Sequence, residues 1–181
     1  MVELLCNGIN SFLTTYFSEG KQSGVPEDLD HYDKNIEQIE LELRDLISQK
    51  LNDAAELDAY QELVPEHLKE KVEGKIKSWI TKNPGEDKSQ FLMIRRRLDF
   101  FDLQEYFDLI STKINWILFE ETFGSKGNLQ TRFVQLGELR NGIRHSRGAT
   151  EVAIKDGEAA IAWFNSIIRS MLVRGESKEI E

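Results

Sequence analysis

The residues of this sequence that are best suited to chemistry are concentrated in residues 139–147, which read L-R-N-G-I-R-H-S-R. Histidine exchanges a proton near neutral pH, arginine presents a planar fork of donors to phosphate oxygens, and asparagine both donates and accepts hydrogen bonds. Together these side chains suit proton transfer around a phosphodiester whose negative charge must be held. The candidate residues are Arg140, Asn141, Arg144, His145 and Arg147.

The same stretch also has a structural interpretation, in which it is simply the basic end of a helix. Arginines in the last turns of a helix offset the negative pole of the helix dipole, and this role requires no substrate. On local chemistry alone, the structural interpretation is favoured.

The spacing Arg140-Asn141-x-x-x-His145 resembles the signature of the HEPN family, in which an arginine, a polar residue and a histidine close a helical hairpin. An amphipathic helix and a short glycine-containing loop precede the motif and a final helix follows it, so the resemblance covers roughly residues 98–173. It implies a compact helical bundle, commonly dimeric. Many HEPN domains are metal-independent RNA endonucleases of toxin–antitoxin, phage-defence and RNA-processing systems, whereas others only bind.

The resemblance also implies roles for the individual residues. His145 would act as general base or acid around the 2′-hydroxyl and the leaving 5′-oxygen, Arg140 would stabilise the charge on the phosphorane, and Asn141 would orient the histidine or the phosphate. Arg144 and Arg147 would bind RNA phosphates. The products would be a 2′,3′-cyclic phosphate and a 5′-hydroxyl, and no metal or other cofactor would take part.

Helical geometry indicates that the motif needs help to form one site. At about 100° per residue, Asn141 lies about 100° and His145 about 140° around the helix from Arg140. Glu138 shares the side of Asn141 and His145 and is a candidate supporting residue. A common site requires either that Gly142 loosens the last turns or that a second copy of the helix meets the first across a two-fold axis. The family's solution resembles the second, so we expect a homodimer through the motif helix.

Composition and charge limit the alternatives. With 40% apolar and 30% charged residues, the chain is typical of a folded globular protein. Its net charge is -9, and residues 1–90 hold 10 Lys or Arg against 19 Asp or Glu, whereas residues 91–150 hold 9 against 7. A strongly negative protein disfavours uniform RNA binding but leaves a local basic site open.

Two classes of function therefore stay open. The intact Arg-Asn-His set favours an endoribonuclease, alone or as the effector end of a larger defence protein, in which an inhibitor protein or a fused domain keeps the site inactive. The acidic net charge favours a catalytically silent HEPN-like bundle that serves for dimerisation and binds RNA, a nucleotide or a protein partner. We expect the endoribonuclease.

No metal site, disulfide framework or membrane partner is expected. Cys6 is the only cysteine, and the three histidines are widely separated. No apolar run reaches the roughly 18 residues of a membrane span, and the amino terminus lacks the positively charged start of a signal peptide. These features predict a cytoplasmic protein.

Hydrophobic periodicity predicts an all-α fold of at least five helices, with an acidic helical extension in residues 1–90 and a HEPN-like bundle in residues 91–181. In the extension, helices are expected over about residues 33–64 and 65–81, and the inward face of the first is expected to run from Ile36 to Leu57. The apolar stretch in residues 2–17 has two interpretations, a short helix packed on the bundle or the remnant of a larger protein.

In the bundle, inward-facing residues at alternating spacings of four and three predict one long helix over residues 103–121, with a seam of Leu103, Phe107, Ile110, Ile114, Ile117 and Glu121. The short loop at residues 124–128 then requires an antiparallel motif helix, with Asn128 as its expected cap and Gly148 as its expected stop. A tail helix is expected over about residues 156–172.

Three groups of residues have both a functional and a structural interpretation, and the structural one is favoured for each. Trp116 and Phe119 could stack on bases, but aromatic residues of this kind more commonly pack on a neighbouring helix. Arg95–Arg97 could clamp RNA, but three consecutive residues fan around a helix, and we expect them to pair with Asp99 and Asp102. Four acids without a partnering histidine are expected to form a solvated helix face: Glu37, Glu40, Glu42 and Asp45.

Overall fold

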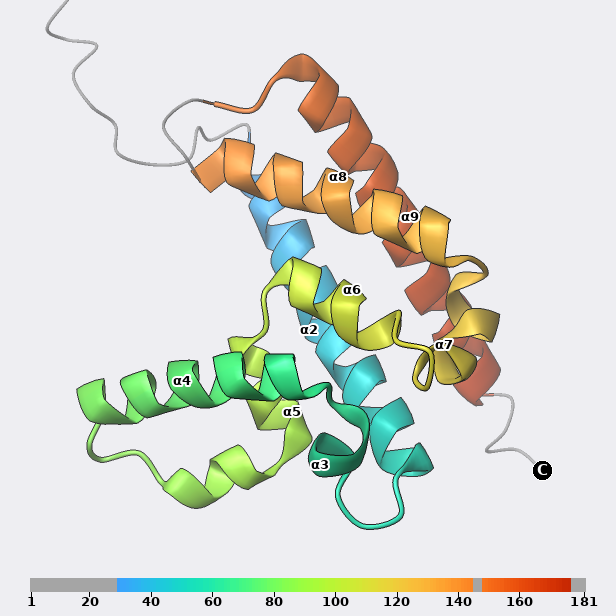
Figure 1. The fold of residues 1–181 in the computed structure, drawn as a ribbon. Coiled ribbons are helices and arrows are strands. Elements are labelled where there is room, and N and C mark those ends of the chain that lie inside the picture. Colours follow the sequence, from blue (N-terminus) through green and yellow to red (C-terminus); the bar gives the residue numbers. More distant parts are fainter. Residues whose placement is uncertain (1–28, 145–147, 177–181) are drawn as a thin grey trace, which may run out of the picture.

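The fold is entirely helical in the residues that the computed structural model describes, 29–144 and 148–176 (Figure 1). The predicted all-α class is therefore confirmed for this part of the chain, and so is the expectation of at least five helices. Residues 2–17 lie outside the described part, as do His145 and Arg147. None of the described helices combines the length and the apolarity needed to cross a membrane.

The helices form two groups that share one long helix, α2 (Figure 1). Helices α8 and α9 lie side by side near one end of α2, and α3, α4 and α5 gather near its other end, with α6 and α7 between the groups. The elements, in chain order, are α2 (Asp30–Ala54), α3 (Ala59–Leu63), α4 (Glu66–Lys82), the 3₁₀ helix η1 (Lys88–Leu92), α5 (Ile94–Arg97), the 3₁₀ helix η2 (Leu98–Phe100), α6 (Leu103–Ile110), α7 (Trp116–Phe123), α8 (Lys126–Arg144) and α9 (Glu151–Glu176).

Helix α2 holds the two groups together through an apolar stripe that is fully buried. The stripe recurs every three or four residues, as an amphipathic helix requires, and it packs against α9, α8 and α7 as well as against α3 and α5. A single hydrophobic core therefore contains residues from both sides of residue 90, and the boundary predicted there does not separate two cores. The stripe consists of Ile36, Ile39, Leu43, Ile47 and Leu51.

The single helix predicted over residues 33–64 is wrong, because residues 55–58 separate α2 from α3. The Asp58 carboxylate accepts hydrogen bonds from two backbone N–H groups at the start of α3. The Glu62 carboxylate accepts three more from the backbone of the break itself, which lowers the pKa of Glu62. These caps satisfy the amides that a continuous helix would have used, and Leu57, which was expected to face inward, is 96% exposed.

The single helix predicted over residues 103–121 is also wrong, because α6 and α7 are separate helices with a turn at residues 111–115. The buried side chain of Asn115 fixes this turn by donating hydrogen bonds of 2.9 Å to a carbonyl oxygen of α6 and to the one at the end of α3. A buried amide needs such partners, and here they outweigh the apolar pattern. Ile114 and Ile117, which the pattern placed inside, are exposed.

Helix α8, which carries the motif, runs antiparallel to α6, as expected (Figure 1). It begins at Lys126, so the predicted cap at Asn128 is wrong. Ser125 takes that role, because its hydroxyl oxygen accepts the backbone N–H of Asn128 at 3.2 Å. Beyond α8, Gly148 has a φ of 72°, a left-handed conformation that favours glycine and suits the expected stop.

Two glycines bring α9 and the segment before it close to α8. A Cβ atom on Gly142 would lie 2.7 Å from Cα of Ala149, and one on Gly157 would overlap the side chain of Leu139. Gly142 therefore serves close approach of the returning chain. It does not loosen α8, which is continuous through this residue to Arg144. Helix α9 is longer than the predicted residues 156–172 at both ends.

Candidate functional site

The last two turns of α8 carry the part of the motif that the structure describes. Leu139 and Ile143 are buried in the core and fix the rotation of the helix. Arg140 lies at the edge of the buried stripe, where helical geometry predicts it, and 26% of its side chain is exposed. Asn141 and Arg144 are exposed. The position of His145 relative to these residues lies outside the described part.

Arg140 pairs with a buried carboxylate of α2. Its Nη1 atom lies 3.1 Å from Oε1 of Glu40, a residue that is only 6% exposed. On the other side of the same carboxylate, Nη2 of Arg44 lies 3.2 Å from Oε2. Burial raises the pKa of the Glu40 carboxyl, while the neighbouring guanidinium groups, Arg140 foremost, oppose that shift. The expectation that Glu40 belongs to a solvated face is wrong, because α8 covers it.

Arg144 pairs with two carboxylates near the start of α2. Its Nε atom donates to Oδ1 of Asp33 at 2.9 Å, and its Nη2 atom donates to Oε1 of Glu37 at 3.1 Å. Partial burial lowers the pKa of Arg144, but the hydrogen bond and charge of Asp33 and the charges of the other acids outweigh burial, so the pKa is raised. Arg144 therefore faces α2 in this conformation.

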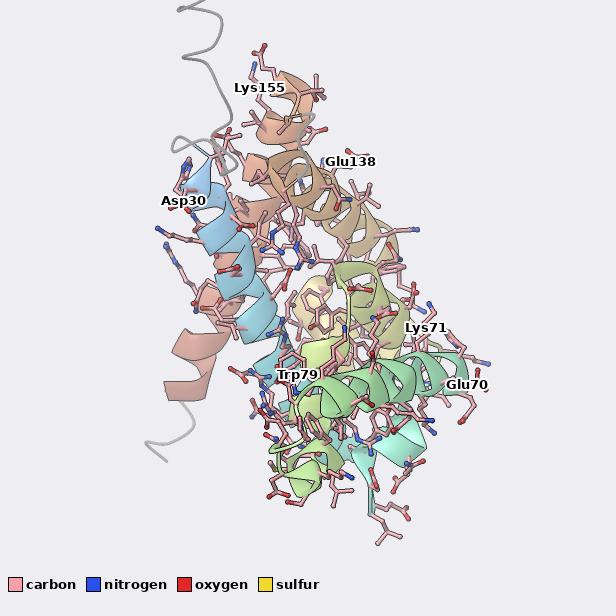
Figure 2. All side chains as sticks on the ribbon, turned by 90° about the vertical axis from the view of Figure 1, so that its left-hand side faces the viewer. Asp30, Glu70, Lys71, Trp79, Glu138 and Lys155 are labelled. Carbon is pink, nitrogen blue, oxygen red and sulfur yellow. The ribbon has the colours of Figure 1, made fainter. Side chains whose placement is uncertain are left out.

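A shallow depression of about 380 Å³ lies between α8 and the start of α6. Three of the residues predicted to form the site line it, namely Glu138, Arg140 and Asn141. Figure 2 shows Glu138 on the side of α8 that faces away from α2. Glu138, Arg140 and Asn141 thus line one depression, while Arg144, one turn beyond Arg140 on the same face of the helix, is paired with α2.

A network of charged groups continues from the Arg140–Glu40 pair into the molecule. Arg44 donates to the hydroxyl of Tyr106 at 2.8 Å and lies 3.5 Å from Asp99, and Tyr106 in turn donates to a backbone carbonyl at 2.8 Å. Burial, which outweighs the contact with Arg44, raises the pKa of Tyr106 to about 12. The sequence interpretation missed this network. A signal was present, because Glu40 stands at helical spacing within the apolar stripe of α2.

The arginine run Arg95–Arg97 is not a free basic surface. Arg95 and Arg96 pair with Asp99 at 2.9 and 2.8 Å, as expected. Arg97 pairs with Glu73 at 2.6 Å, and its guanidinium lies 3.9 Å from the ring centroid of Tyr60. The predicted pairing of the run with Asp102 is wrong, since that carboxylate pairs with a lysine of α4. These contacts favour a structural role for the run.

Both aromatic residues of α7 that were considered for base stacking pack against the core. Phe119 is fully buried and stacks on Phe123 with a centroid separation of 6.2 Å. Trp116 is partly buried against the core, and the ammonium group of Lys126 lies 5.4 Å from its ring centroid. The structural interpretation of these two residues is confirmed.

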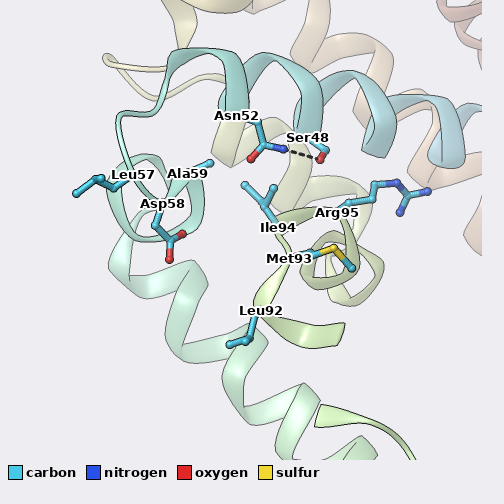
Figure 3. A pocket seen from close by; sticks show the side chains of 9 residues that line it. All are labelled: Ser48, Asn52, Leu57, Asp58, Ala59, Leu92, Met93, Ile94 and Arg95. Carbon is cyan, nitrogen blue, oxygen red and sulfur yellow. Dashed lines mark hydrogen bonds between the residues drawn. The ribbon is translucent and has the colours of Figure 1, made fainter. Parts of the chain in front are cut away.

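A second depression, of about 340 Å³, lies near the carboxyl end of α2 (Figure 3). Its polar groups already have partners: Asn52 donates to Ser48 at 3.4 Å, Asp58 caps α3, and Arg95 pairs with Asp99. No side chain here is left for proton transfer or charge stabilisation. Elsewhere in residues 29–144 and 148–176, no three His, Cys, Asp or Glu side chains converge as metal ligands would.

Comparison with known proteins gives no match: no family model, no curated protein and no solved structure is significantly similar to this chain. The resemblance to the HEPN family therefore rests on the motif and its setting in the sequence.

Proposed function

We propose that the end of α8 is the active site of a metal-independent, HEPN-like endoribonuclease that leaves 2′,3′-cyclic phosphate and 5′-hydroxyl ends. One observation carries the proposal: Arg140 and the exposed Asn141 line the same depression, and His145 follows them in the sequence by five and four residues. A site of this kind requires a fixed cation, a neutral hydrogen-bonding group and a proton-transfer group close together.

Arg140 has the properties required of the cation in this proposal. Its pairing with the buried Glu40 fixes the guanidinium, while about a quarter of the side chain stays exposed toward the depression. Preorganised donors stabilise a developing charge better than mobile donors, because they need not reorganise during the reaction. In the proposed reaction the 2′-oxygen forms a bond to phosphorus as the bond to the 5′-oxygen breaks. His145 takes the proton of the 2′-hydroxyl or gives one to the leaving oxygen.

We also propose that the active form is a homodimer in which two copies of α8 meet. The motive comes from the sequence: on one continuous helix, Arg140 and His145 would lie about 140° apart, and a second copy of the helix would compensate for this angle. The surface with Glu138 and Asn141 is exposed in the single chain and is available for such a contact.

Sedimentation at micromolar concentration should give a dimer, and Glu138→Arg should weaken it. A monomer would contradict the shared cleft.

The deciding experiment is incubation of the purified protein with mixed RNA in the presence of EDTA. Asn141→Ala and His145→Ala should each abolish cleavage, whereas Asn128→Ala, at another exposed asparagine of α8, should leave it intact. Removal of an exposed polar side chain such as that of Asn141 usually changes stability by no more than about 0.5 kcal/mol, so activity lost in Asn141→Ala will not reflect unfolding. Cleavage that persists in His145→Ala, or that requires Mg²⁺, would refute the assignment.

A second candidate function is a catalytically silent HEPN-like bundle that dimerises and binds RNA, a nucleotide or a protein. The observation that favours it is that carboxylates of α2 already neutralise Arg140 and Arg144. In this case the two arginines serve stability, and neither wild-type protein nor variants cleave RNA under any condition of the assay.

A further inference from the structure

The contact between α2 and the end of α8 consists of two cations facing three carboxylates. Arg140 and Arg144 stand one helical turn apart on α8, and the acids stand at spacings of four and three on α2, so both sets form a stripe along one helix face. The inner contact is Arg140 with Glu40, and the outer contact is Arg144 with Asp33 and Glu37.

The inner and outer contacts differ in their exposure to solvent. The Glu40 carboxylate is buried, and it lies between two guanidinium groups. In the outer contact, 35% of the Arg144 side chain, 59% of the Glu37 side chain and 20% of the Asp33 side chain are exposed. Exposed ion pairs are weak and screened by salt, whereas a buried carboxylate that loses its partner is strongly unfavourable. The outer contact can therefore exchange its carboxylates for another anion while the inner contact holds α2 in place.

The donors that Arg144 uses are those that suit a phosphate. Its Nε and Nη2 atoms, which form one edge of the guanidinium fork, each donate to a separate carboxylate oxygen. The same edge can donate two parallel hydrogen bonds to two oxygens of one phosphate group. Asp33 and Glu37 thus place carboxylate oxygens where a phosphate would place its own.

We infer that Asp33 and Glu37 are internal competitors of RNA for Arg144: in the free protein they occupy a phosphate-binding site, and a bound RNA strand displaces them. The inference rests on the proposed function for its ligand, single-stranded RNA. It adds a regulatory feature, because the affinity for RNA is set by the acidic end of α2 as well as by the motif.

The test compares two double variants that remove the same two charges from α2. Asp33→Asn with Glu37→Gln removes the competitors, and Glu42→Gln with Asp53→Asn is the matched control on the same helix. Binding of a fluorescein-labelled oligouridine strand is measured by anisotropy in EDTA over a range of salt concentrations. The first variant should bind about two- to fivefold more tightly than the control. Its salt dependence should be steeper by about 0.7, the contribution of one more phosphate contact on a single strand.

Arg144→Gln, added to the first variant, should abolish the gain in affinity, because the gain acts through this guanidinium. The inference is overturned by equal affinities of the two double variants, by a gain that survives Arg144→Gln, or by no RNA binding in any protein. Should the double variant unfold, Glu37→Gln alone removes the more exposed competitor and should show part of the gain.

Cleavage of RNA, measured on the same samples, tests the proposed function separately. Tighter binding of the first variant without cleavage by the wild-type protein refutes the nuclease and leaves the competition standing. Cleavage by the wild-type protein, together with equal RNA binding by the two double variants, supports the nuclease and refutes the competition.

Discussion

The two groups of arginines in this protein are both held by acids, yet their surroundings differ. Arg95–Arg97 lie in a short segment between two 3₁₀ helices, and Asp99, only three or four residues away, pairs with two of them. Arg140 and Arg144 lie at the end of a long helix, and their partners on α2 are about a hundred residues away in the chain. The first group shares a partner within its own segment, although Arg95 also pairs with Asp45 of α2 and Arg97 with Glu73 of α4. The second group has its acidic partners on α2 alone and ties two distant helices together beside exposed polar groups.

The difference shows why a basic run in a sequence is a poor guide to an anion site. Consecutive arginines point in different directions, and acids close by in the sequence neutralise them at little entropic cost. Two arginines one helical turn apart point the same way, and they act on whatever the fold places opposite them. The acids opposite the second pair lie on another helix, so the site depends on the tertiary structure.

The largest expected effect is on the free energy of unfolding, and it differs between the two groups of arginines. Arg140→Ala leaves the buried Glu40 carboxylate without one of its two cations and should lower the free energy of unfolding by about 2–3 kcal/mol, somewhat below the cost for a fully buried pair because Arg140 is partly exposed. Arg96→Ala should cost less than about 1 kcal/mol, since Asp99 keeps two other arginines. Urea unfolding measures both, and equal losses would break the comparison.

The next largest effect on stability is expected at the close contact between Gly142 of the motif helix and Ala149. Gly142→Ala places a methyl group against the backbone of Ala149, which must shift, and should cost about 1–3 kcal/mol. Gly137→Ala is the matched control on the same helix, because its Cβ would meet open space and alanine is the better helix former. A melting temperature that falls in the first variant and holds or rises in the second supports a tightly packed site.

The pH dependence of stability provides a third contrast, between Glu40 at the site and Glu62, which caps the break after α2. The raised pKa of Glu40 means that the folded state binds its proton more tightly, so its contribution to stability is full below the ordinary value near 4.5 and is lost as pH rises through the raised pKa. The lowered pKa of Glu62 acts in the opposite direction, and its contribution is lost as pH falls.

The measurement is the free energy of unfolding between about pH 3 and 7. Glu40→Gln should remove the part of the profile that declines with rising pH, and Glu62→Gln should remove the part that declines with falling pH. Profiles that change in the same direction would contradict the two opposite environments.

The smallest effect concerns RNA affinity. In the protein freed of its competitors, Asp33→Asn with Glu37→Gln, removal of Arg144 should reduce the salt dependence of RNA binding by about 0.7. Arg96→Ala in the same background should leave it unchanged, since that arginine serves Asp99. A larger effect of Arg96→Ala would identify the arginine run as the RNA-binding surface.

Periodicity alone predicted most of the helical content, including α4 almost to the residue. The errors share a physical cause, which is that a polar side chain satisfies the backbone at a point where the apolar pattern continues. Asp58 ends one predicted helix, Asn115 divides another, and Ser125 moves a cap. The contacts of Asp58 and Ser125 are local to their turns, whereas Asn115 also bonds to the end of α3. Pattern reasoning along one segment does not detect them.

For the candidate site, helical geometry correctly placed Arg140 at the edge of the apolar stripe of α8. The sequence interpretation missed Glu40, which was assigned to a solvated face because its acidic neighbours dominate that stretch. Its spacing from Ile36 and Leu43 places it within the buried stripe. A carboxylate in such a position requires a cation opposite, and this is a physical reason to look for an arginine on another helix.

The packing of α2 against α8 and α9 affects how the protein is made. The contact from Glu40 to Arg140 closes a chain loop of about a hundred residues, which places this surface among the slow, non-local steps of folding. On a ribosome that adds roughly 5–20 residues per second, α2 emerges about 5–20 seconds before its partner. The site therefore cannot assemble on a nascent chain until α8 has been made, and a fragment cut at residue 90 would expose the aliphatic stripe of α2 and invite aggregation.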